Sequence, residues 1–135
     1  MKSICKNMFN CPVEATIRLI GGKYKAVILW HLMNQTLRYN EIHKRIPNAT
    51  DKMLAQQLRE LEKDGLINRT VYPVVPPKTE YSLTDFGQTL APILDAMCDW
   101  GTNYLNGYLF QSFLHISFQK TASILQAHKT GSLDL

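Results

Sequence analysis

Four side chains suited to nucleic-acid contact recur at the spacing of one helical face. They are Lys52, Gln56, Arg59 and Lys63. At 100° per residue they fall within about 60° of one another, opposite the leucines at positions 54, 58 and 61. Lys and Arg bind phosphates, and Gln or Arg reaches base edges with paired hydrogen bonds. This ridge is therefore typical of a helix that enters a major groove, although any exposed helix also carries a charged face.

Cysteine supplies the second candidate chemistry. The chain has Cys5, Cys11 and Cys98, an odd number without the spacing of a disulfide scaffold or a zinc site. Cys11 directly precedes Pro12, which suits the first position of a helix. A helix N-terminus favours the thiolate form of a thiol. Cys98 is expected in the core or at an interface.

The residues around the ridge predict the elements that position it. Helices are expected over 12–20, 25–33, 40–46 and 50–64, followed by strands over 66–75 and 79–83 and a last helix over 84–106. Thr50 is the expected N-cap of the ridge helix and Gly65 its end, and Pro92 is expected to kink the last helix. A short helix pair followed by a hairpin is the order of a winged helix-turn-helix. The predicted fold class is therefore mainly α with a small β-hairpin wing (α+β).

The hairpin adds a second basic surface to the ridge. Arg69 and Lys78 flank its Pro-Pro tip, and a rigid basic wing can lie along the DNA backbone or the minor groove. Residues near the start of a recognition helix usually reach deepest into the groove. Base contacts are therefore expected from the start of the ridge helix, and phosphate or flanking-base contacts from Arg59 and Lys63. The full predicted DNA-binding set is Arg38, Thr50, Lys52, Met53, Gln56, Gln57, Arg59, Lys63, Arg69 and Lys78.

Charge follows the same division of the 135-residue chain. The segment 18–80 contains eleven Lys or Arg and six Asp or Glu, whereas 81–107 contains three Asp and no Lys or Arg.

A hydrophobic fraction of 45% excludes a disordered chain. No apolar run reaches the roughly 18 residues that span a bilayer, and the start lacks a signal-peptide core, so a cytoplasmic protein without membrane contact is expected. Because no metal-ligand cluster, phosphate loop or catalytic arrangement is recognisable, no metal, cofactor or enzymatic activity is expected.

Several motifs along the chain form one joint pattern. They are CPVE at 11–14, IGGKYK at 20–25, LRYNEI at 37–42, KMLAQQLRELE at 52–62, DGL at 64–66, VYPVVPPK at 71–78, EYSLT at 80–84 and WG at 100–101. Together they resemble the HxlR-type winged-helix transcriptional regulators, relatives of the MarR group. The resemblance covers residues 10–107. It leaves an N-terminal arm over 1–9 and a C-terminal tail over 108–135, whose apolar spacing allows a further helix.

The resemblance implies a function for the chain. It implies a bacterial homodimeric regulator that binds double-stranded DNA. A symmetric dimer would read a two-fold related operator, and a repressor is expected, with an activator left open. The first and last helices would form the dimer interface, which suits the segment 81–107 without Lys or Arg. The resemblance also implies a response to an electrophile or oxidant through cysteine, with Cys11 as the redox-sensing residue and Cys5 as the second candidate. Two alternatives stay open: Cys11 without a regulatory role, and a winged-helix protein-interaction module whose ridge meets an acidic protein.

Overall fold

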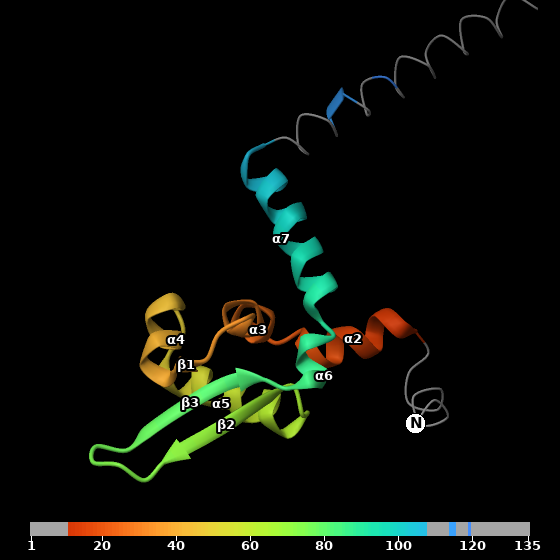
Figure 1. The fold of residues 1–135 in the computed structure, drawn as a ribbon. Helices are drawn as coiled ribbons and strands as arrows, with labels where there is room; N and C mark the ends of the chain where they lie inside the picture. The colour runs from red at the N-terminus through yellow and green to blue at the C-terminus, as the bar shows by residue number, and fades with distance from the viewer. Residues whose placement is uncertain (1–10, 108–113, 116–118, 120–135) are drawn as a thin grey trace, which may run out of the picture. The chain divides into compact units, whose positions relative to one another are not determined.

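The computed structural model describes residues 11–107, 114, 115 and 119, and within residues 11–94 helices pack beside a small sheet (Figure 1). The elements, in chain order, are α2 (Pro12–Ile20), α3 (Lys25–Leu32), β1 (Leu37–Arg38), α4 (Tyr39–Arg45), α5 (Asp51–Lys63), β2 (Ile67–Tyr72), β3 (Lys78–Leu83), α6 (Asp85–Gln88) and α7 (Ala91–Leu105). The chain divides into two compact units, Met1–Leu94 and Asp95–Leu135. The helix pair α4–α5 and the sheet lie in the first unit. The expected arm over 1–9 and most of the tail over 108–135 lie outside the described residues.

Local signals in the sequence account for the helix ends. Pro12 occupies the first turn of α2 and Gly21 follows its last residue. Helix α5 begins after Thr50 and is followed by Gly65, whose φ of 76° is a left-handed conformation that glycine adopts without strain. The mainly α fold with a β-hairpin wing is confirmed.

The sheet is antiparallel, with strand order β1-β3-β2. Tyr81 of β3 pairs with Leu37 of β1 and with Arg69 of β2. The preceding residue of β3, Glu80, pairs with Arg38 of β1 and with Thr70 of β2. Successive side chains of a strand point to opposite faces. Leu37, Tyr81 and Ile67 face the core, so Arg38 and Glu80 lie on the outer face.

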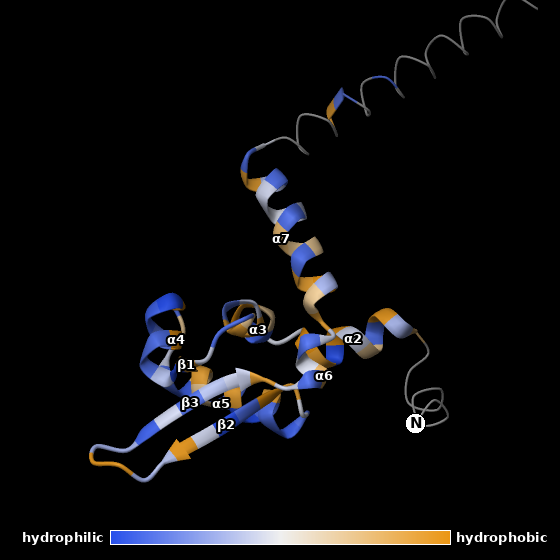
Figure 2. Cartoon of the chain, viewed as in Figure 1, coloured by the Kyte–Doolittle hydropathy of each residue, from blue (hydrophilic) through white to orange (hydrophobic). Residues whose placement is uncertain are grey.

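One hydrophobic core joins α3, α5 and the inner face of the sheet. The three leucines expected on one face of α5 are 0–2% exposed, which confirms that face. Helix α3 contributes the buried residues Ile28, Leu29 and Leu32. In Figure 2 the apolar colour of α5 lies on the side toward the sheet. Burial of this face fixes which side of α5 remains for solvent or a partner.

Three details of the predicted elements are wrong. The last helix is not continuous over 84–106: α6 ends at Gln88, and Pro92 lies in the first turn of α7, where its missing N–H costs nothing, instead of kinking one helix. The first strand ends at Tyr72 and not at 75, because Pro73 follows it and cannot donate to the ladder. The two-residue strand β1 was not expected at all.

Much of the apolar surface of α7 is exposed. The apolar stripe that helical spacing predicts for this part of the chain is Phe86, Leu90, Leu94, Met97 and Tyr104. Of these only Leu90 and Leu94 are buried, while Phe86, Met97 and Tyr104 are 49–57% exposed, as is the neighbouring Trp100 at 60%. The rings of Trp100 and Tyr104 stack with centroids 5.3 Å apart. Cys98 is also exposed, so of the two places expected for it, core or interface, the core is excluded. No helix in the described ranges is both long and apolar enough to cross a membrane.

A tight junction between the wing and α6 generates the first prediction. The Thr84 hydroxyl donates to the carbonyl of Gly65 (2.6 Å) and accepts from the N–H of Gly87 (2.9 Å). A Cβ at Gly87 would overlap the backbone carbonyl oxygen of Leu66. We expect Gly87→Ala to lower the free energy of unfolding by about 1–3 kcal/mol, because backbone must shift to make room. Gln88→Ala, at the exposed next position, is the control, and equal unfolding midpoints for the two variants in urea would contradict the close approach.

Candidate nucleic-acid interface

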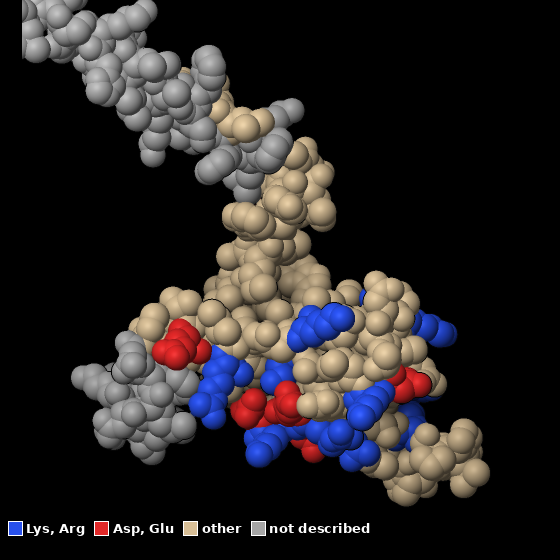
Figure 3. Space-filling view, turned by 180° about the vertical axis from the view of Figure 1, so that it is seen from behind, with Lys and Arg blue, Asp and Glu red and all other residues tan. Residues whose placement is uncertain are grey.

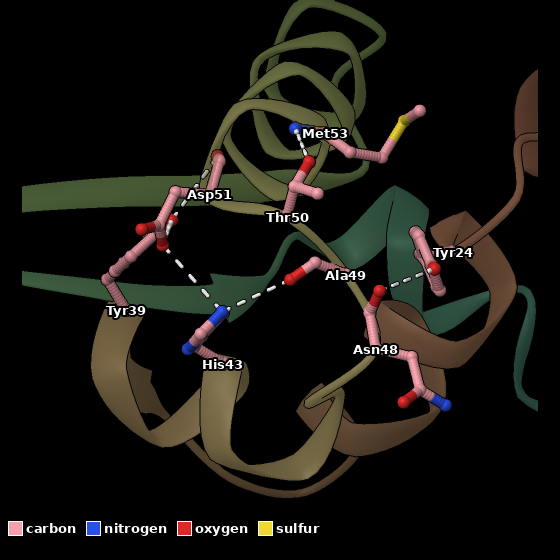
Figure 4. A network of polar contacts seen from close by, with 8 residues as sticks. All are labelled: Tyr24, Tyr39, His43, Asn48, Ala49, Thr50, Asp51 and Met53. Carbon is pink, nitrogen blue, oxygen red and sulfur yellow. Dashed lines mark hydrogen bonds and ion pairs between the residues drawn. The ribbon is translucent and has the colours of Figure 1, made fainter.

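The start of α5 is fixed by side-chain caps. The hydroxyl of Thr50 accepts a hydrogen bond from the N–H of Met53 (3.1 Å), which confirms Thr50 as the N-cap. Asp51 lies in the first turn, where a carboxylate is favoured by the helix dipole. One of its oxygens accepts from the hydroxyl of Tyr39 in α4 (2.9 Å; Figure 4). The beginning of α5 is therefore tied both to its own backbone and to α4.

The turn between α4 and α5 is held from two sides. Nε2 of His43 lies 3.2 Å from the carbonyl oxygen of Ala49 and 3.7 Å from the Asp51 carboxylate. Because a carbonyl only accepts, this ring nitrogen carries the proton. The hydroxyl of Tyr24 donates to the carbonyl of Asn48 (3.3 Å). Figure 4 shows these side chains converging on the turn from α4 and from the segment before α3.

The same contacts change the titration of Tyr39. Burial raises the pKa of Tyr39 to about 12, and the hydrogen bond to Asp51 and its negative charge act in the same direction. The phenol therefore stays a hydrogen-bond donor throughout the neutral range.

Polar contacts also hold the inner side of α5. The ammonium of Lys25, a residue only 7% exposed, lies 2.6 Å from Oε2 of Glu60. The side-chain oxygen of Gln57 accepts from the backbone N–H of Tyr24 (3.3 Å). A Cβ at Gly22 would overlap that same oxygen, so glycine leaves the space for the contact. These contacts join α5 to the segment that begins α3.

The outward face of α5 carries the expected ridge. Lys52, Gln56, Arg59 and Lys63 are all exposed. Gln57, by contrast, is 6% exposed and bonded to the backbone, so its expected place among the DNA-contacting residues is wrong. The ridge is also not isolated from acids, because Nε2 of Gln56 donates to Oε1 of Glu60 (3.2 Å). The hydrogen bond from Lys25 lowers the pKa of Glu60 most, and the hydrogen bond from Gln56 lowers it further.

The basic residues of the sheet divide between its two faces. Arg69 pairs with the inward-facing Tyr81, and with Arg59 of α5 it lines a hollow between that helix and the sheet. Arg38 and Lys78 line a second hollow between the start of α4 and the Pro-Pro tip. Figure 3 shows Lys and Arg spread over one face of the first unit, with acidic side chains among them.

Lys78 is less available than the sequence suggested. Its ammonium lies 2.8 Å from Glu80 and 5.0 Å from the centre of the Tyr72 ring. The hydrogen bond from Lys78 lowers the pKa of Glu80. Part of the positive charge expected at the wing is therefore neutralised within the wing itself.

The described cysteines are free thiols. Cys11 is exposed and is the N-cap of α2, as the sequence predicts, and Cys98 is exposed on α7. Cys5 lies outside the described residues. Among the described residues no three of His, Cys, Asp and Glu are grouped as a metal site would need.

Tyr39 provides a test of the turn contacts. Because its pKa is raised above the ordinary 10.0, its stabilising contribution is complete below pH 10 and is lost as the pH rises toward 12. In alkaline absorbance titrations, we expect the difference between the native protein and Tyr39→Phe to be one phenol titrating near pH 12. Asp51→Asn should lower that value. If the phenol that Tyr39→Phe removes instead titrates near pH 10, the contact between Tyr39 and Asp51 is contradicted.

Comparison with known proteins agrees with this geometry. The model of the HxlR-like helix-turn-helix family matches residues 19–108. The chain is 54% identical over 101 residues to the HTH-type transcriptional regulator YtcD of Bacillus subtilis, covering 75% of this chain and 80% of that protein.

Solved structures give the same result. The redox regulator HypR in its oxidized form is similar with a TM-score of 0.67 and 50% identity, covering 69% of this chain and 96% of that one. The reduced form of the transcriptional regulator YodB from B. subtilis has a TM-score of 0.60 and 34% identity, covering 71% and 95%. With its capped helix pair, its wing and these relatives, the chain belongs to the HxlR-like helix-turn-helix family and is a transcriptional regulator of the helix-turn-helix type.

Proposed function

We propose that this protein is a homodimeric repressor that reads a two-fold related operator with α5 and the wing, and that oxidation or alkylation of Cys11 releases it from DNA. The observation that carries the DNA-binding part is the exposed ridge on a helix fixed at its cap, its turn and its inner side. Fixed donors and cations of this kind meet base edges and phosphates without further ordering.

The residues of the ridge and wing have different roles. Thr50, Lys52, Met53 and Gln56, at the start of α5, contact base edges, and Arg59 and Lys63 contact phosphates. Arg69 adds a cation beside Arg59. Arg38 and Lys78 contact the DNA backbone at the other hollow, Lys78 with reduced effect because Glu80 already binds it. Gln57 is left out because it is buried.

A second copy of the chain is the proposed partner of the exposed apolar residues on the first and last helices. Val13 and Ile17 of α2 are 57–64% exposed, and α7 exposes Trp100 and Tyr104 to a similar extent. Symmetric dimers are the usual oligomers of soluble proteins. A dimer would place the two α5 helices about 34 Å apart, one helical turn of DNA.

The sensing part of the proposal rests on Cys11. Its thiol is exposed at the N-terminus of α2, one of the two helices assigned to the dimer interface, so a reagent can reach it. Chemistry there would change how two copies meet and hence the spacing of the α5 helices. Cys5 is the second candidate. One similar protein, HypR, is described as a redox regulator.

The ridge predicts a salt dependence that can be measured. With a duplex selected from a random pool, Arg59→Ala should weaken binding and reduce the slope of log affinity against log salt by about 0.9, because one phosphate contact is lost. Lys23→Ala removes the same charge from an exposed position outside the proposed surface and should leave the slope unchanged. Equal slopes for the native protein and Arg59→Ala would contradict the ridge. Failure to select any duplex would favour a protein-interaction module.

Cys11 is tested by substitution and treatment with a quinone or a peroxide. We expect Cys11→Ser to stay bound to DNA in a mobility-shift assay, because the reactive thiol is gone. Cys98→Ser is the matched control, and it should be released like the native protein. Release of Cys11→Ser would show that Cys11 is not the sensor and would direct the same test to Cys5.

A further inference from the structure

Two successive polar contacts connect the interior of the protein to the ridge. They begin at the nearly buried ammonium of Lys25, pass through Glu60 and end at Gln56. Each oxygen of the Glu60 carboxylate has its own donor: Oε2 is 2.6 Å from Lys25, and Oε1 is 3.2 Å from Nε2 of Gln56. The Gln56 side chain is therefore held in place, through Glu60, by the nearly buried Lys25.

The charge state of Glu60 decides which end of the Gln56 amide faces it. The neighbouring Lys25 ammonium lowers the pKa of Glu60, so the side chain is a carboxylate at neutral pH. A carboxylate only accepts hydrogen bonds, whereas an amide has a donating nitrogen and an accepting oxygen. Of the two orientations related by a flip of the amide, only the one with Nε2 toward Glu60 makes a hydrogen bond.

The selected orientation leaves a defined recognition group. Nε2 carries two protons, so donation of one to Glu60 leaves the other available, and no residue in the described part of the chain donates a hydrogen bond to Oε1. An oxygen beside an N–H is the pair with which Gln binds adenine, accepting from N6 and donating to N7 in the major groove. Without Glu60, the same amide could present the two groups in either order.

We propose that Glu60 is a specificity-determining positioning residue, which fixes the Gln56 amide in the orientation that reads an adenine. This inference rests on the proposed function, in which α5 enters the major groove. Glu60 itself touches no base. Glu62, two residues further along, is exposed, and in the described part of the chain its carboxylate makes no hydrogen bond or ion pair.

The experiment measures preference between duplexes rather than affinity alone. The selected duplex is compared with duplexes in which each A·T pair of a half-site is replaced in turn by G·C. The native protein should show a preference at one A·T pair that Gln56→Ala abolishes. Glu60→Gln keeps the size of the side chain and an acceptor for Lys25, but it can also donate and so no longer selects one amide orientation. We expect it to lower the preference at that same pair by about three- to tenfold, a part of what a bidentate base contact supplies.

Two controls separate positioning from charge and from stability. Glu62→Gln removes the same charge and should leave the preference at every pair unchanged. In a Gln56→Ala background, Glu60→Gln should have no further effect at that pair, because the group it positions is gone. A purely structural role would instead weaken binding to all duplexes by one factor.

The outcomes distinguish this inference from the proposed function. If Gln56→Ala changes the preference and Glu60→Gln does not, the inference is overturned and the proposed function stands. The inference is equally overturned if Glu60→Gln and Glu62→Gln act alike. If Gln56→Ala changes no preference at all, the base contact of the proposed function is itself wrong.

Discussion

The attachment of the inner side of α5 to the segment before α3 is the interaction on which the rest of the interface depends. Lys25 is nearly buried, and an ammonium there without a partner would be costly, so Glu60 has to lie opposite it. Gln57 meets the backbone of Tyr24 from the same side, and Gly22 leaves the room for it. Together these contacts set the rotation of α5 about its axis. The exposed ridge is the face that remains.

The parts of the fold that depend on neighbouring residues were predictable from the sequence. Thr50 and Gly65 mark the ends of α5, and leucine spacing identifies its buried face. The burial of Gln57 follows from the same spacing, since at 100° per residue it lies about 60° from Leu54, beside the leucines and away from the ridge.

Other features depend on partners far along the chain. Nothing near Lys25 in the sequence indicates a buried ion pair, because its carboxylate comes 35 positions later, at Glu60. Strand β1 has two residues and exists through its pairing with β3. The loss of free charge at Lys78 likewise follows from strand geometry, which places Tyr72 and Glu80 beside it. Residue counts predict a basic wing but not how much of its charge is free.

The proposed DNA-binding surface consists of α5 and the wing, and not of the apolar helices. An NMR titration of the ¹⁵N-labelled protein with a selected duplex tests it most directly. If α5 and the wing bind the duplex, the largest shifts on saturation will fall on the amides of α5 and of the hairpin formed by β2 and β3, with small shifts in α2 and α7. Shifts concentrated in α2 and α7, with α5 unchanged, would contradict it.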